Sequence, residues 1–325
     1  MPRPQLKLDP LIMLILGAVA LAIVLPIQGR PAEIFSTATK IAIALLFFLY
    51  GARLSPAEAL AGLKHWRLHS VIQTFTFVVF PIIGLALAPL AHIFGPELYR
   101  GILYLTLVPS TVQSSIAFTS IARGNVAGAI VSASASNLIG VFATPLLVML
   151  LMTNGTSGIT VDGHVFLDIA IQLLLPFILG QLSRRWVKEI AANKATKIVD
   201  RGSITMVVYS AFSHGMVEGI WGQVSVAKVL GLIVFSIVLV MAMLWLTRFT
   251  AERLHFDSAD MKAIQFCGTK KSLATGLPMA AVIFGTGGLG LLILPLMIFH
   301  QVQLMICAAV ASRYAAAPDE NATQG

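Results

Sequence analysis

The sequence predicts an all-α integral membrane protein with ten transmembrane helices arranged as two inverted five-helix repeats. Of its 325 residues, 57% are hydrophobic and 11% are charged, whereas about a quarter of the residues of a soluble domain are charged. Apolar runs recur along the whole chain with short polar interruptions, and the fourth run of each half is itself broken. Because no long polar block remains, a soluble domain on a single anchor is excluded.

Ten apolar runs define the expected helices. A membrane-spanning helix needs roughly 20 apolar residues to cross the hydrocarbon core. In chain order the runs are Leu11–Ile27, Ile34–Leu54, Leu68–Ala91, Ile102–Ile121, Val126–Met152, Val165–Leu182, Ile204–Trp221, Val226–Leu246, Ala263–Phe284 and Leu289–Ala311. We expect 1–325 to form a single polytopic membrane domain, with the first repeat over 1–152 and the second over 163–313.

Lysine and arginine are distributed unevenly between alternate connections. With a cytoplasmic N-terminus, the inner connections hold sixteen of these residues and the outer ones hold three. Cytoplasmic connections carry the excess of positive charge, so we expect both termini in the cytoplasm, in a bacterial inner (plasma) membrane. The longest connection, 183–203, is expected to be a basic cytoplasmic loop beside membrane lipid. This asymmetry explains the net charge of +8 without a nucleic-acid partner.

Runs four and nine are expected to be broken helices. Pro109 interrupts run four, and Gly268 and Pro278 interrupt run nine. Each of these runs is the fourth helix of a five-helix half. Because five is odd, the second half inserts with the opposite orientation, as in the inverted repeats of many secondary transporters, whose substrates bind at interrupted helices.

Lys270 and Lys271 lie near the middle of run nine. A charge at that depth costs at least ~2.5–3.5 kcal/mol on insertion scales, so it is rare and commonly functional. One interpretation is that the run is shorter and the lysines extend to the membrane surface. The other is that one of them faces a water-filled crossing point, where it attracts an anionic substrate or replaces a bound cation. Thr269 and Ser272 add hydroxyl groups on either side.

Polar side chains also concentrate after the break in run four. Pro109 removes a helical hydrogen bond and frees carbonyl groups. The candidate substrate contacts near it are Ser114, Ser115, Thr119 and, in run five, Asn137. For each hydroxyl alone, a hydrogen bond to its own helix backbone is the common alternative. The alternating Ser and Ala residues of run five are also typical of close helix packing.

His214 and Glu218 stand four residues apart and therefore share one face of run seven. They are candidates for ion coupling together with Lys270, because histidine titrates near neutral pH and intramembrane carboxylates relay protons. A structural pair at the membrane edge is the alternative. Cys267 and Cys307 show no metal-ligand spacing and are expected to be packing residues. The sequence holds no HExxH, GxSxG or P-loop motif, so neither an enzyme nor a cofactor or metal site is expected.

The segment from Ser114 to Pro145, SSIAFTSIARGNVAGAIVSASASNLIGVFATP, resembles the bile acid:sodium symporter (BASS) family. The broken run nine, FCGTKKSLATGLPMA, is similar to the divergent SBF-like branch of that family. The resemblance covers nearly the whole chain. It implies a panel of runs one, two, six and seven, and a core of the other six in which runs four and nine cross. It also implies alternating-access transport of organic anions with sodium.

The sequence departs from the sodium-coupled pattern of that family. The glutamate of the family's E-x-G-x-Q-N motif falls on Phe266, and its Gln and Asn fall on Lys270 and Lys271. Hard cations need several oxygen ligands, preferably including carboxylate, and no Asp or Glu lies between Lys262 and Ala311. We therefore expect the usual Na+ sites to be absent, with the Lys270 ammonium occupying one cation position.

Together these observations predict a secondary transporter of a small organic anion, driven by protons, by the substrate gradient or, less readily, by sodium. The alternative is a transporter-like membrane regulator or sensor without appreciable flux. A strict requirement for Lys270 with no measurable transport would favour the alternative.

Overall fold

The computed structural model describes residues 10–53, 65–152, 170–217, 219, 222, 224–285 and 289–317. Over these ranges the chain forms helices and no strand. Where the sequence predicts a single domain, the chain divides into two compact units. Unit one comprises Met1–Leu54, Val161–Val224 and Leu277–Leu291, and unit two comprises Ser55–Thr160, Ser225–Gly276 and Leu292–Gly325.

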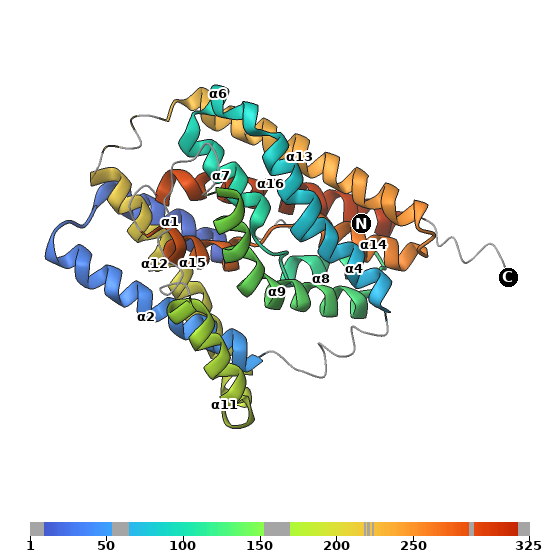
Figure 1. The fold of residues 1–325 in the computed structure, drawn as a ribbon, viewed down its shortest axis with the longest axis horizontal. Helices are drawn as coiled ribbons and strands as arrows, with labels where there is room; N and C mark the ends of the chain where they lie inside the picture. The colour runs from blue at the N-terminus through green and yellow to red at the C-terminus, as the bar shows by residue number, and fades with distance from the viewer. Residues whose placement is uncertain are drawn as a thin grey trace. The chain divides into compact units, whose positions relative to one another are not determined.

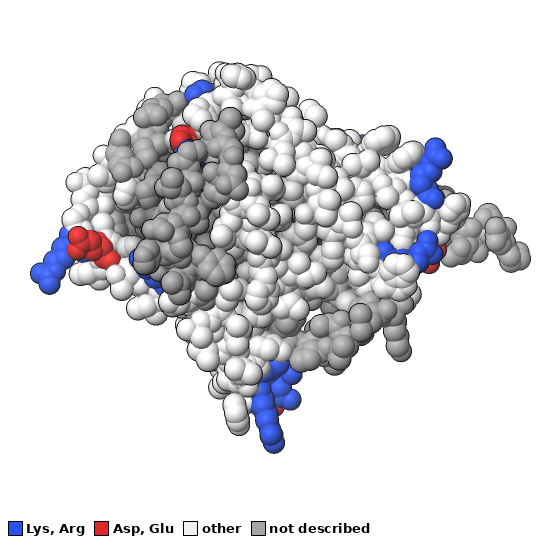
Figure 2. All heavy atoms as spheres, in the orientation of Figure 1, with Lys and Arg blue, Asp and Glu red and all other residues white. Residues whose placement is uncertain are grey.

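The described helices include five that are long and apolar enough to cross a membrane. They are Arg30–Arg53, Trp66–Ala86, Val126–Met152, Val226–Arg253 and Leu289–Ala316. Large apolar side chains such as Leu230, Val234 and Val238 lie exposed along one of them. On the face shown in Figure 2, Lys and Arg gather in small groups with a few Asp and Glu, and a broad area of other residues lies between them. An exposed apolar surface of this kind is suited to lipid.

Unit one is built from two packed helix pairs. Its helices are α1 (Pro10–Val24), α2 (Arg30–Arg53), α11 (Leu175–Ala192), preceded by the π-helical turn η4 (Ala170–Leu174), and α12 (Lys197–Val217) (Figure 1). Helices α2 and α11 approach closely, because a Cβ on Gly51 would overlap the Phe177 carbonyl and one on Gly180 would overlap the Phe48 carbonyl. Small residues allow membrane helices to pack at such short range.

The connection between α11 and α12 differs from the expected loop over 183–203. Helix α11 continues to Ala192, a short 3₁₀ turn (η5) spans Lys194–Thr196, and α12 already begins at Lys197. The prediction of a loop is therefore wrong for most of this stretch. The segment after Ser183 is polar but contains no Gly or Pro before α11 ends, so the polar boundary of the run does not stop the helix.

Unit two contains the remaining long helices (Figure 1). In chain order its elements are α4 (Trp66–Thr74), the π-helical turn η2 (Phe75–Val79), α5 (Phe80–Ala86), η3 (Ala88–Leu90), α6 (Ala91–Phe94), α7 (Pro96–Leu107), α8 (Gln113–Ile121), α9 (Val126–Met152), α13 (Val226–Arg253), α14 (Ser258–Thr269), the start of α15 (Leu273–Phe284) and most of α16 (Leu289–Ala316).

Runs four and nine are broken helices. Run four divides into α7 and α8, and Pro109 lies in the non-helical segment between them, as predicted. Run nine divides into α14 and α15, with Lys270, Lys271 and Ser272 between them. Gly268 lies inside α14 and Pro278 lies inside α15, so their assignment as helix breaks is wrong.

The glycines of run nine allow neighbouring side chains to pack closely and do not interrupt the helices. A Cβ on Gly268 would lie 3.2 Å from the Thr247 methyl group, and one on Gly276 would lie 2.9 Å from Leu296. Pro278 falls in the second turn of α15, where it removes a single helical hydrogen bond. The helix is consequently interrupted only at the two lysines and Ser272.

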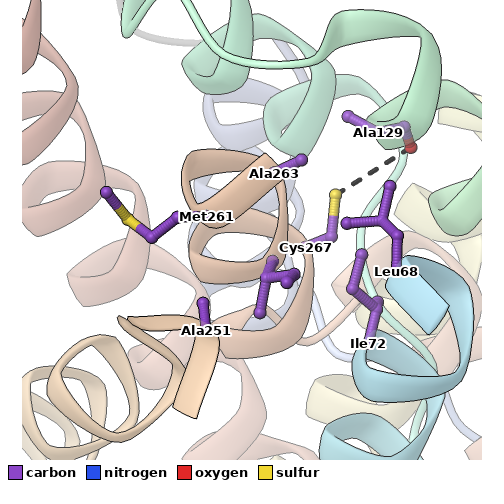
Figure 3. Packing of buried hydrophobic residues seen from close by; sticks show 8 residues of the cluster. Leu68, Ile72, Ala129, Ala251, Met261, Ala263 and Cys267 are labelled. Carbon is purple, nitrogen blue, oxygen red and sulfur yellow. Dashed lines mark hydrogen bonds between the residues drawn. The ribbon is translucent and has the colours of Figure 1, made fainter. Parts of the chain in front are cut away.

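Cys267 packs in an apolar cluster of unit two, which confirms the prediction of a packing residue. Figure 3 shows its side chain directed toward the carbonyl of Ala129, beside Leu68 and Ile72. The Sγ to carbonyl oxygen distance is 3.9 Å. Cys307 is also a buried, free cysteine.

Candidate functional site

The two broken helices meet inside unit two. The backbone N–H of Ser272 donates to the carbonyl of Pro109 over 2.7 Å. The Ser110 hydroxyl donates to the carbonyl of Cys267 over 2.6 Å. A longer bond of 3.4 Å joins the Ser115 hydroxyl to the carbonyl of Phe266. Hydrogen bonds therefore connect the break in run four directly to the break in run nine.

The central residue of each break is held by a side chain of another long helix, α9 for Ser110 and α16 for Lys271. The Ser110 N–H donates to Ser136 Oγ over 3.0 Å, and the Ser110 carbonyl accepts from Asn137 Nδ2 over 2.9 Å. The Lys271 N–H donates to Gln303 Oε1 over 2.9 Å, and the Lys271 carbonyl accepts from Gln303 Nε2 over 2.8 Å. Side chains thus replace the hydrogen bonds that each break removes from its helix, as buried backbone groups require.

Lys271 is fully buried, and backbone oxygens surround its ammonium group. Nζ lies 2.8 Å from each of three carbonyl oxygens, those of Thr76, Thr106 and Val108. The ring centroid of Phe80 lies 4.3 Å from the same nitrogen. Three acceptors require three N–H donors, which only the charged ammonium form supplies.

Lys270 is equally buried but has a different environment. Its Nζ lies 3.8 Å from the ring centroid of Phe118 and 5.9 Å from that of Phe266. Among the residues that the structure describes, no hydrogen-bond acceptor contacts this nitrogen. The aromatic rings attract the ammonium electrostatically, but its three N–H groups stay without oxygen partners within the described chain.

These two environments correct the sequence expectations. Neither lysine extends to the surface, so that interpretation is wrong. The expectation that the Lys270 ammonium occupies one cation position stays a prediction. In the structure Lys271 lies among carbonyl oxygens, and Lys270 lies against aromatic rings. The sequence places both lysines at the same depth and does not distinguish them, since the atoms that do so are backbone carbonyls.

The other candidate polar residues line the same crossing and bond mainly to protein groups. The Thr111 hydroxyl lies 2.7 Å from that of Ser114 and 3.1 Å from that of Ser115. Thr119 donates to the Ser115 carbonyl of its own helix, which is the common alternative for such a residue. Thr269 lies 3.3 Å from the Thr247 hydroxyl.

A chain of hydrogen bonds joins Ser272 to Asn137. The Ser272 hydroxyl lies 3.0 Å from Thr275 Oγ1, which donates to Asn137 Oδ1 over 2.7 Å. Asn137 is half-buried, so part of its side chain stays accessible. The structure thus brings together Asn137, Ser272 and both lysines in unit two.

The structure does not test the proposed ion-coupling pair of run seven. His214 lies half-buried in α12, which belongs to unit one. Glu218 lies outside the described residues. Their assignment as ion-coupling groups therefore stays a prediction.

Two residues at the crossing have roles that the sequence did not reveal. Tyr104 is fully buried, and its hydroxyl donates to the carbonyl of Gly276 over 2.7 Å. Gln303 is also buried and supports the backbone of Lys271 through its side-chain amide. Its signal was an amide close to His300 and Gln301 in the middle of a mainly apolar run, where an unpaired amide is costly. Within the described ranges, no group of three or more His, Cys, Asp or Glu side chains is placed to hold a metal ion.

Comparison with known proteins supports the resemblance to the bile acid:sodium symporter family that the residues of runs four, five and nine indicate. The profile of the SBF-like CPA transporter family matches residues 9–316. The putative symporter YfeH of Escherichia coli K12 is 47% identical over 310 residues, covering 94% of this chain and 93% of the relative. Sodium/bile acid cotransporter 7 of Danio rerio is 32% identical over 289 residues, covering 86% and 84%. The chain belongs to the SBF-like CPA transporter family, a membrane transporter family of the bile acid:sodium symporter type.

Proposed function

We propose that this protein is a secondary transporter of a small organic anion that works by alternating access. The observation that carries the proposal is the ammonium of Lys270. It is buried at the crossing of two broken helices, and no described residue offers it an oxygen partner. A buried charge without a partner is costly and marks a functional site in a membrane helix. A carboxylate bound at the crossing would supply the missing partner.

The arrangement of helices supports alternating access by inverted repeats over 1–152 and 163–313. Unit one contains the helices expected for the panel, and unit two contains those expected for the core except Leu277–Leu291, which belongs to unit one. In unit two, Ser110 and Lys271 occupy equivalent places in the two breaks, and each has its N–H and carbonyl bonded to the fifth helix of its half. Such an equivalence is what a duplicated five-helix repeat would produce.

Coupling to sodium is not part of the proposal, although some relatives are named sodium/bile acid cotransporters. The motif position that carries glutamate in the resembled family is Phe266 here, and a lysine ammonium occupies the group of carbonyls at the crossing. We place the protein in a bacterial inner membrane with both termini in the cytoplasm, and we propose that protons or the substrate gradient drive transport.

The test combines stability and flux. Thermal unfolding of the purified protein with a panel of carboxylates, among them pyruvate, succinate and taurocholate, identifies an anion that raises the melting temperature. Uptake of that anion into proteoliposomes is then measured with sodium or choline outside, and with or without a pH gradient. Lys270→Ala should abolish the anion-dependent stabilisation and reduce uptake at least tenfold. Lys262→Ala, in the preceding helix α14 and outside the crossing, is the matched control and should retain both.

Two results would contradict the proposal. Undiminished uptake by Lys270→Ala would remove the ammonium from the substrate site. Stabilisation that requires Lys270 without any flux would favour the regulator or sensor instead. Sodium-dependent uptake would leave an anion transporter but would refute the proposed coupling.

A further inference from the structure

We infer that the carbonyls of Thr76, Thr106 and Val108 form a monovalent-cation site that the chain fills with its own Lys271 ammonium. The three carbonyl oxygens lie 2.8 Å from Nζ. They come from η2 and from the end of α7, whereas Lys271 comes from the break in run nine. One cation therefore joins three segments that are far apart in the sequence.

Each of the three carbonyls lacks its helical donor. In the π-helical turn, the Phe80 N–H donates to the carbonyl of Phe75 instead of that of Thr76. The next residue is Pro81, which has no N–H to offer to Thr76. The Thr76 carbonyl is therefore directed away from its own helix and needs another donor.

The other two carbonyls belong to the first break. Helix α7 ends at Leu107, so its last carbonyls have no donors within the helix. The Ser110 N–H, which a continuing helix would direct to Thr106, donates to Ser136 Oγ instead. Val108 lies in the break itself. Backbone distortion at two places thus creates a cluster of oxygen atoms with a high affinity for positive charge.

The chemistry of this cluster selects a monovalent cation. The three oxygens are neutral, and the sequence holds no Asp or Glu between Lys262 and Ala311, so run nine and the following helix supply no carboxylate for a divalent ion. Three carbonyls match the three N–H donors of an ammonium group, and the Phe80 ring adds a favourable cation–π contact at 4.3 Å. Because the cation is covalently part of the chain, it cannot leave during transport. This consequence for coupling rests on the proposed function, whereas the site itself does not.

The site can be opened by truncating its resident cation. In Lys271→Ala, the carbonyls remain and the volume of the lysine side chain is freed. Unfolding is followed in detergent with ammonium, ethylammonium or sodium chloride, and with choline chloride at equal ionic strength as a cation too large for the site. We expect the variant to melt well below the native protein. A fitting cation should raise its melting temperature saturably, by at least about 2 °C at tenfold excess over its Kd.

Two controls make the result specific. The native protein, whose site is full, should respond to ammonium no more than to choline. Lys270→Ala removes a neighbouring lysine of equal burial and should also show no selective response. Equal melting temperatures of Lys271→Ala in all four salts, or the same rescue in Lys270→Ala, would overturn the inference.

If Lys271→Ala does not fold, the stabilities of two nearly isosteric variants are compared instead. Lys271→Met retains the bulk of the side chain and removes its charge, and Lys270→Met does the same one residue earlier. The inference requires Lys271→Met to be much the less stable of the two, and equal stability would refute it. No substrate enters these measurements, so their failure would remove the cation site and leave anion transport standing. Absence of a Lys270-dependent response to carboxylates would instead remove the proposed anion transport and leave the cation site standing.

Discussion

Lys271 places its ammonium 2.8 Å from each of three carbonyl oxygens, whereas the ammonium of Lys270, one residue earlier, faces the ring of Phe118 at 3.8 Å. Both side chains are fully buried. The first charge satisfies backbone groups that the helix breaks leave without donors. The second has aromatic neighbours and no oxygen partner among the described residues. Burial alone therefore does not assign a role to an intramembrane lysine, because the role depends on which acceptors reach the nitrogen.

Replacing each lysine by methionine should have opposite effects on stability, and this is the largest difference that we expect. Lys271→Met leaves three buried carbonyls without a donor and should lower the free energy of unfolding by about 3–5 kcal/mol. Lys270→Met removes a buried charge without an oxygen partner and should raise it by about 1–2 kcal/mol. Denaturant titration in detergent measures both values. A loss of similar size in the two variants would show that the environments are equivalent and would contradict the comparison.

The sequence allowed us to predict a group of polar residues at the crossing and to place both lysines near the middle of run nine. It did not allow us to predict which lysine lies among oxygen atoms and which lies against aromatic rings. Pro109 predicted the break in run four, and the pair of lysines predicted a polar crossing in run nine. The carbonyls of Thr106 and Val108 have no side-chain signature. Pro81 indicates that a carbonyl about one turn earlier lacks its donor, but only the π-helical turn makes this the carbonyl of Thr76.

Helix ends were predicted less well than helix positions, because the apolar pattern reports the membrane and not the hydrogen bonds. Helix α11 continues to Ala192 through a polar stretch that was expected to be a loop. Gly268 and Pro278 lie within helices, since close packing and the second turn of α15 explain them without a break. Among the described residues, five helices are long and apolar enough to cross a membrane, and ten passes stay a prediction.

The side chains that hold the two breaks allow a second comparison, with a smaller expected effect. Gln303 is fully buried and makes two hydrogen bonds to Lys271, whereas Asn137 is half-buried and makes one to Ser110. Gln303→Leu should lower the free energy of unfolding by about 2–3 kcal/mol, because it leaves a buried N–H and a buried carbonyl unpaired. Asn137→Leu should cost about 1–2 kcal/mol, since Ser136 still accepts the Ser110 N–H. Thermal unfolding of both variants checks the order, and a larger loss in Asn137→Leu than in Gln303→Leu would contradict this comparison.

Removing the contact between Lys270 and Phe118 should change the free energy of unfolding least among these variants. A buried cation–π contact stabilises by about 0.5–2 kcal/mol, and the cost of the desolvated charge offsets it. Phe118→Leu should therefore lower the stability of the native protein by about 1 kcal/mol and have less effect in the Lys270→Met background.

A double-mutant cycle isolates this contact from the packing of Phe118 against Phe266, whose ring centroid is 6.2 Å away. Packing is lost equally with and without the lysine, so only the interaction with the ammonium remains in the coupling energy. Phe249→Leu, combined with Lys270→Met, is the matched control, because Phe249 stacks on Trp245 in α13. A coupling energy near zero for Phe118 would mean that the ring merely covers the ammonium. A favourable coupling would mean that a bound anion must compete with the ring for Lys270, so that Phe118→Leu should also tighten the binding of a stabilising carboxylate.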